Sequence, residues 1–278
     1  MTSSPKFIDL MPNSPNGPTG WVYECTNEDL PTLRSLTSTA VRGGWFLRRV
    51  KKVGSIASGG EVPLTVLLPA VKGELIAVDH SLGSLAWAFF KVHLLQRFPT
   101  TTEFKKWLKD VDEAEFTKVF KEVIATLPFS APNYLVGWGM SSNLEHIRNQ
   151  WLSTPAALLS KARERLDLIT FIHGDITDIA PYGPFDLLYV SNALAHVTSK
   201  TNQEHTGDAI KPLLTARGKV IATHDLTPVL GPPQANKLTT WDSIKYVRVT
   251  NPTTRWGNIT WNYNLYQKPS AQAPSKTG

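Results

Sequence analysis

The stretch KKVGSIASGGEVPLTVLLPAVKGELIAVD, residues 51–79, predicts a strand, a turn, a short apolar helix and a second strand. The first strand, 50–56, runs into a turn at Gly59 and Gly60, where backbone without side chains can lie against a ligand. The second strand ends at Asp79. A nucleoside-binding βαβ unit uses a carboxylate at this place to hold ribose hydroxyls. The stretch therefore predicts an enzyme that binds a nucleoside cofactor.

The turn itself indicates which kind of cofactor to expect. It contains two adjacent glycines but no G-x-G-x-x-G, so it offers few backbone amides to a pyrophosphate. Glu61 follows the glycines, and a carboxylate there would repel a phosphate. A cofactor without phosphates suits the turn better, and S-adenosylmethionine (AdoMet) is the common one. The alternative is a parallel-sheet turn that binds nothing, because Gly-Gly turns are frequent in α/β proteins.

The rest of the chain predicts one α/β domain. A helix over 82–97 is followed by a helical insertion over 98–165, which Pro128 and Pro132 interrupt and which we expect to cover the site as a lid. Apolar runs typical of buried parallel strands occupy 167–173, 185–190 and 218–223. The segments 244–250 and 258–267 predict a terminal hairpin. We expect the AdoMet-binding domain to span 21–268, with disordered segments at 1–20 and 269–278.

Five parallel strands followed by a hairpin with an antiparallel strand are typical of the doubly wound, Rossmann-like class I methyltransferase fold. Within that layout, several stretches resemble the AdoMet:diacylglycerol aminocarboxypropyl transferases of betaine-lipid synthesis. They are 52–60, 76–81, 90–95, 99–104 and 185–192, together with Tyr23, Glu28 and Asp29. The resemblance implies an enzyme that moves the four-carbon amino-acid arm of AdoMet instead of its methyl group.

The chemistry of AdoMet follows from its sulfonium, because all three neighbouring carbons are electrophilic and the protein chooses which one faces the nucleophile. Attack on the methyl leaves S-adenosylhomocysteine, whereas attack on the γ-carbon leaves 5′-methylthioadenosine. We expect Asp79 to accept from the ribose hydroxyls, Asp175 to accept from the adenine amino group, and Ile176 to pack on the ring. For Asp175 the alternative is a helix N-cap or a turn. The predicted cofactor-binding residues are Ser58, Gly59, Gly60, Asp79, His80, Asp175, Ile176 and Ser191.

The predicted catalytic residues are Tyr189, Asn192 and Tyr23. Tyr189 lies at the carboxyl end of a strand, where its ring could stabilise the sulfonium by cation–π attraction, with core packing as the alternative. Tyr23, Glu28 and Asp29 could hold the ammonium of the arm, although Asp29 is equally suited to an N-cap.

Two further sets of residues contain histidine. His224 and Asp225 could form a general base with its orienting carboxylate, or a surface pair. His80, His93 and His146 lack metal-ligand spacing, so the sequence predicts no metal.

Composition narrows the setting. The chain has one cysteine, Cys25, so no internal disulfide can form and a reducing, cytoplasmic compartment is expected. Its first twenty residues lack the apolar region of a signal peptide, and the longest apolar run, 62–71, is too short for a membrane span. The net charge is +6, but the basic residues are scattered, so we expect a small-molecule substrate and no nucleic acid. Peripheral membrane contact and the oligomeric state stay open.

Three functions therefore remain. The first is attack on the γ-carbon of the methionine arm, by an acceptor or by the α-amino group of AdoMet itself, which would close the ring of azetidine-2-carboxylate. The second is an ordinary AdoMet-dependent small-molecule methyltransferase, because a fold does not determine a function. The third is a non-catalytic binding protein with the same fold. The nucleoside product of an incubation with AdoMet distinguishes them.

Overall fold

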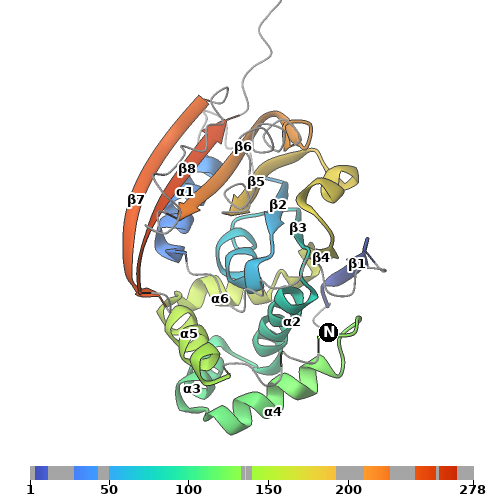
Figure 1. Ribbon diagram of the computed structural model, residues 1–278, viewed down its shortest axis with the longest axis vertical. Helices are drawn as coiled ribbons and strands as arrows, with labels where there is room; N and C mark the ends of the chain where they lie inside the picture. The colour runs from blue at the N-terminus through green and yellow to red at the C-terminus, as the bar shows by residue number, and fades with distance from the viewer. Residues whose placement is uncertain are drawn as a thin grey trace, which may run out of the picture.

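The centre of the protein is one eight-stranded sheet. The structure is a computed structural model that describes residues 4–11, 28–42, 50–132, 135, 140–191, 210–225, 242–254 and 257–267. Figure 1 shows the strands side by side in the order β1-β4-β3-β2-β5-β6-β8-β7. Their bounds are β1 Lys6–Asp9, β2 Lys52–Ile56, β3 Glu74–Asp79, β4 Ile169–His173, β5 Phe185–Ser191, β6 Leu214–Asp225, β7 Asp242–Thr254 and β8 Gly257–Gln267.

The strand order confirms the predicted class I methyltransferase fold. The strands from β1 across to β6 are parallel, and β8 lies antiparallel between β6 and β7. β2 pairs with β3 on one side and with β5 on the other, so the chain reverses its direction of winding between β2 and β5. Ligands of open α/β sheets bind at this switch point, outside the carboxyl ends of the strands.

Both faces of the sheet are buried, as the apolar strands predict. One face carries Val53, Leu75, Phe171 and Leu187 and packs in the main core, which includes residues of α1 (Leu30–Arg42), η2 (Val62–Leu67) and α2 (Leu82–Arg97). The opposite face forms a smaller core with η5 (Ile176–Tyr182). The helix α2 has the predicted bounds: the Ser81 hydroxyl caps its start, and it stops at Phe98, the residue before Pro99.

The N-terminal segment corrects one expectation. Residues 1–20 were expected to be disordered, but β1 pairs in parallel register with β4, and Leu10 donates its N–H to the carbonyl of His173 at 3.0 Å. The Phe7 ring lies 4.7 Å from Phe129 and 6.0 Å from Phe89. These partners lie far along the sequence, so local composition gave no sign of them. Residues 1–3, 12–20 and 268–278 lie outside the described part of the chain.

The insertion between α2 and β4 is helical, as predicted. It comprises α3 (Thr101–Asp110), α4 (Glu113–Ile124), α5 (Met140–Ser153), α6 (Ala156–Arg163) and the short η4 (Leu166–Leu168). In the view of Figure 1, α3, α4 and α5 form a layer beyond α2 and α6. Phe120 stacks on Trp87 at 4.1 Å, while Glu115 lies 3.8 Å from Arg97. Hence α4 runs antiparallel to α2. The C-terminal part of α4 lies near the start of α2, just after Asp79.

That packing limits which part of the insertion can act as the predicted lid. Phe104, Leu108 and Phe116 belong to the main core, so α3 and α4 are held with or without a ligand. Residues 125–132 follow α4 towards the carboxyl edge of the sheet, and their side chains are exposed or only partly buried. Among the described residues, no helix has the length and apolar composition needed to span a membrane.

We expect residues 125–132 to gain protection from hydrogen exchange when AdoMet or its product binds, because a lid must become ordered to exclude water. Peptides covering α3 around Phe104 serve as the internal control and should exchange equally in both states. Unchanged exchange of residues 125–132 with a saturating ligand would show that the insertion is purely architectural.

Candidate active site

The turn after β2 has an unusual backbone. Ser58, Gly59 and Gly60 all have positive φ angles, of 42°, 72° and 103°. A side chain on Gly60 would also meet α2, because a Cβ built there lies 2.8 Å from the Cα of Ala88. The Gly60 N–H donates to the Ala57 carbonyl, and the Ser58 N–H donates to Asp79. Two of the turn amides are therefore engaged within the protein, which leaves no row of amides for a pyrophosphate.

Glu61 does not lie on the ligand side of this turn. Its side chain is fully buried and forms an ion pair with Lys91 of α2. The expectation that its charge would repel a phosphate is therefore wrong, although the engaged amides lead to the same conclusion. The sequence around Glu61 does not show that its partner is Lys91 on another helix, so this burial could not be predicted.

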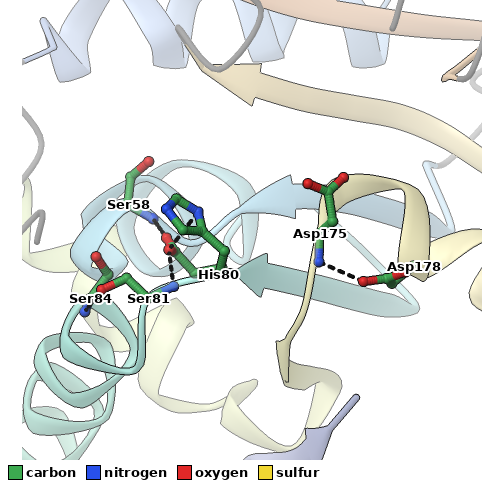
Figure 2. Close-up of polar contacts among 7 residues, drawn as sticks. Ser58, His80, Ser81, Ser84, Asp175 and Asp178 are labelled. Carbon is green, nitrogen blue, oxygen red and sulfur yellow. Dashed lines mark hydrogen bonds and ion pairs between the residues drawn. The ribbon is translucent and has the colours of Figure 1, made fainter. Parts of the chain in front are cut away.

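Asp79 ends β3 as predicted and connects two backbone segments. Its Oδ2 accepts from the Ser58 N–H at 3.1 Å and its Oδ1 accepts from the Ser81 N–H at 3.0 Å. Burial raises the pKa of the Asp79 carboxyl above its ordinary value of 3.8, while the nearby His80 opposes that shift. Figure 2 shows Ser58, His80 and Ser81 gathered at the end of β3. The His80 ring is 45% exposed, with its Nδ1 3.7 Å from Asp79.

Asp175 lies on the neighbouring loop after β4, but its side chain has a local function. Its Oδ1 accepts from the Thr177 N–H at 3.1 Å, and Asp178 accepts from the Asp175 N–H at 2.7 Å, a contact drawn in Figure 2. This reciprocal capping of η5 is the N-cap alternative considered for Asp175. The Ile176 side chain is buried in the smaller core. The Gly174 N–H donates to the Asp79 carbonyl at 3.0 Å, so this loop adjoins Asp79, and contact with adenine stays a prediction.

A second carboxylate, Glu28, lies at the ends of β5 and β6. Its side chain is buried and accepts hydrogen bonds from three hydroxyls: those of Tyr189, Ser191 at 3.0 Å and Thr223 at 2.6 Å. Three donors offset part of the unfavourable free energy of burying a carboxylate. This cluster was not predicted from the sequence, because its members come from segments up to 195 residues apart.

Two buried tyrosines lie close to Glu28, and their surroundings disfavour the ionised phenolate. Burial, together with the adjacent Glu28, raises the pKa of Tyr189 well above its ordinary value. The same two causes raise the pKa of Tyr263 on β8, whose hydroxyl accepts from the Asp29 N–H at 2.5 Å. The Tyr189 side chain is fully buried in the main core, in agreement with the core-packing role given above as the alternative. Its cation–π contact with a sulfonium stays a prediction.

The remaining predicted residues divide into described and undescribed ones. Ser191, the last residue of β5, has a φ of 51°, so a serine with positive φ lies at the carboxyl end of each of the two strands that border the switch point. Asp29 accepts from the Thr32 N–H at 2.8 Å at the start of α1, which is its N-cap alternative. Tyr23, Asn192 and the side chains of His224 and Asp225 lie outside the described residues. Among the described residues, no group of three or more His, Cys, Asp or Glu could hold a metal ion.

Comparisons with known proteins concern the fold. No protein-family model matches the chain, and no curated protein sequence matches it. The chain is similar to the rRNA methyltransferase AviRa from Streptomyces viridochromogenes, with 12% identity, a TM-score of 0.49 and coverage of 90% of this chain and 88% of that one. It is also similar to the N-methyltransferase NodS from Bradyrhizobium japonicum in complex with S-adenosyl-L-homocysteine, with 11% identity, a TM-score of 0.47 and coverage of 88% and 90%. At these identities the similarity extends to the fold alone.

Proposed function

We propose that this protein is an AdoMet-dependent enzyme that directs a nucleophile to the γ-carbon of the methionine arm and releases 5′-methylthioadenosine. The observation that carries the proposal is the buried Glu28 carboxylate, which lies beside the switch point and is held by Tyr189, Ser191 and Thr223. It supports a site for a cation at the place where an α/β sheet of this order binds its ligand.

The chemistry of the polar groups suits AdoMet. Its ribose carries two hydroxyls, from which Asp79 would accept hydrogen bonds. Its methionine arm carries an ammonium, with which Glu28 would form an ion pair. The carboxylates stand on opposite sides of the β2–β5 switch point, Asp79 on β3 and Glu28 beside β5 and β6. This separation suits a cofactor that lies across the crevice, with its ribose over β3 and its arm over β5.

Glu28 also supplies what a reaction at the γ-carbon needs. When the α-amino group is the nucleophile, its ammonium must first lose a proton, because an ammonium has no lone pair. A carboxylate beside the ammonium can accept that proton. The new C–N bond forms as the Cγ–S bond breaks, and the bonding electron pair leaves with sulfur, which keeps its methyl group. An external acceptor would replace the α-amino group as the nucleophile in aminocarboxypropyl transfer.

The test uses AdoMet labelled with ¹³C in its methyl group. Incubation of the full chain with this substrate alone should give labelled methylthioadenosine above the rate of a matched incubation without protein. Azetidine-2-carboxylate in equal amount would identify the cyclisation, whereas methylthioadenosine that forms only with an added nucleophile would identify transfer to an acceptor. Formation of adenosylhomocysteine with label on an acceptor would replace the proposal with the methyltransferase function. Binding of AdoMet without turnover under either condition would indicate a binding protein.

A further inference from the structure

We infer that Lys91 is a positioning residue for the cofactor site: from beneath the Ser58–Gly60 turn, its buried ammonium holds the backbone shape that meets the ligand. The inference rests on the proposed function, because that function binds AdoMet across the crevice between β3 and β5, and this turn follows β2 between them. Lys91 belongs to α2, in the layer below the turn, and it has no role in the chemistry described above.

The contacts of Lys91 converge on the turn. Its Nζ donates to the Gly59 carbonyl at 2.7 Å and pairs with the Glu61 carboxylate, and the side chains of Lys91 and Glu61 are both 0% exposed. The Trp87 ring centroid lies 5.9 Å from the same Nζ. The amides of Ser58 and Gly60 already donate to Asp79 and to the Ala57 carbonyl. The buried lysine donates to the carbonyl of Gly59, the residue between them.

The turn needs external support because its conformation is unfavourable. Three consecutive residues have positive φ, and for Ser58 this region is sparsely populated. Asp79 holds the turn through the Ser58 N–H, on the side of the predicted ribose contact. Lys91 holds it through the Gly59 carbonyl, on the side of the core. The two contacts fix the 57–58 and 59–60 peptide units, on either side of the 58–59 unit. Together they set the direction in which the turn faces the ligand.

Stability alone does not account for this pair. Replacing a buried ion pair with apolar residues of similar volume is often neutral or stabilising, because both charges must lose their hydration on burial. Leucine and methionine could fill the space of Glu61 and Lys91, but neither could donate a hydrogen bond to the Gly59 carbonyl. An apolar replacement of the pair would therefore remove the positioning of the turn while keeping the packing of the core.

The experiment compares the double variant Glu61→Leu/Lys91→Met with Glu61→Gln, which keeps the lysine donor. Urea unfolding measures stability, calorimetry with S-adenosylhomocysteine measures affinity, and hydrogen exchange of the ligand-free protein follows the amides of 57–61. We expect the double variant to be about as stable as the unmodified protein but to bind about 10- to 100-fold more weakly, with faster exchange of the turn. Glu61→Gln should keep most of the affinity.

Three results would overturn the inference. They are unchanged affinity in a folded double variant, a loss in Glu61→Gln as large as in the double variant, and unchanged exchange of the turn. If the double variant does not fold, Glu61→Gln/Lys91→Gln replaces it, because glutamine is one atom shorter than lysine and does not span to the Gly59 carbonyl. Failure of the unmodified protein to bind S-adenosylhomocysteine would count against the proposed function, and the exchange measurement would then decide the inference about Lys91 alone.

Discussion

Replacing Glu28 with glutamine is expected to slow the release of methylthioadenosine by about 10²- to 10⁴-fold, the range usual for removing a general base. Glutamine has nearly the same shape as glutamate, but it cannot accept a proton from the α-ammonium or pair with its charge. Its amide group would also turn hydrogens towards the hydroxyls that now donate to the carboxylate. Single-turnover measurements with saturating AdoMet isolate this effect on the chemical step.

Thr223→Val is the matched control, because it removes one hydroxyl donor at 2.6 Å and keeps the carboxylate. We expect a loss of about tenfold or less, equivalent to one hydrogen bond to a charged group. Urea unfolding of both variants would confirm that the fold is kept. If Glu28→Gln is folded and turns over at the unmodified rate, Glu28 does not act in the reaction, and the proposed site loses the observation that carries it.

Replacing Asp79 with alanine is expected to weaken AdoMet binding by about 1.5–3 kcal/mol, the usual value for a hydrogen bond to a charged group. The loss has two sources, because the carboxylate both accepts from the Ser58 and Ser81 amides and would accept from the ribose. Calorimetry measures it directly. Replacing Asp9, an exposed-edge carboxylate on β1 that lies 2.9 Å from His173, should leave the affinity close to that of the unmodified protein.

The raised pKa of Asp79 adds a dependence on pH to the same prediction. Because the folded protein keeps the Asp79 proton up to a higher pH than the unfolded chain does, this group makes the folded state less stable as the pH rises from 3.8 through the raised pKa. Affinity for AdoMet should increase over the same interval, since ionised Asp79 is the better acceptor. Asp79→Ala should abolish both dependences, and their persistence in that variant would assign them to another group.

Those parts of the fold that depend on local pattern were predictable. The strands that end at Asp79 and His173 are short apolar runs bounded by turns, and α2 begins after a serine and stops before a proline. The hydrophobic pattern and these boundary residues were therefore enough to predict the three elements. β1 was missed because its stability comes from pairing with β4 and from aromatic contacts with Phe89 and Phe129. Pairing across such distances leaves no periodicity in a four-residue strand.

The candidate site divides in the same way. Asp79 was predictable because its position at the end of a strand follows from the sequence, and Asp175 was correctly placed on its loop although its side chain caps a helix. The partners of Glu28 and of Glu61 were not predictable. Glu28 accepts hydrogen bonds from residues of distant segments, and Glu61 pairs with a lysine of another element. One sequence alone does not show which buried polar groups meet in space.

β1 has a consequence for the behaviour of the protein in solution. It is the outermost strand at one side of the sheet and covers β4, whose residues Thr170 to His173 would otherwise present their backbone to solvent. An uncovered strand at that position is a template for pairing with another chain, which leads to aggregation. Lys6 and Asp9, at the ends of β1, place charges on the new outer edge. Trimming the chain before residue 10 would therefore leave the residues of the candidate site in place while making the molecule prone to self-association.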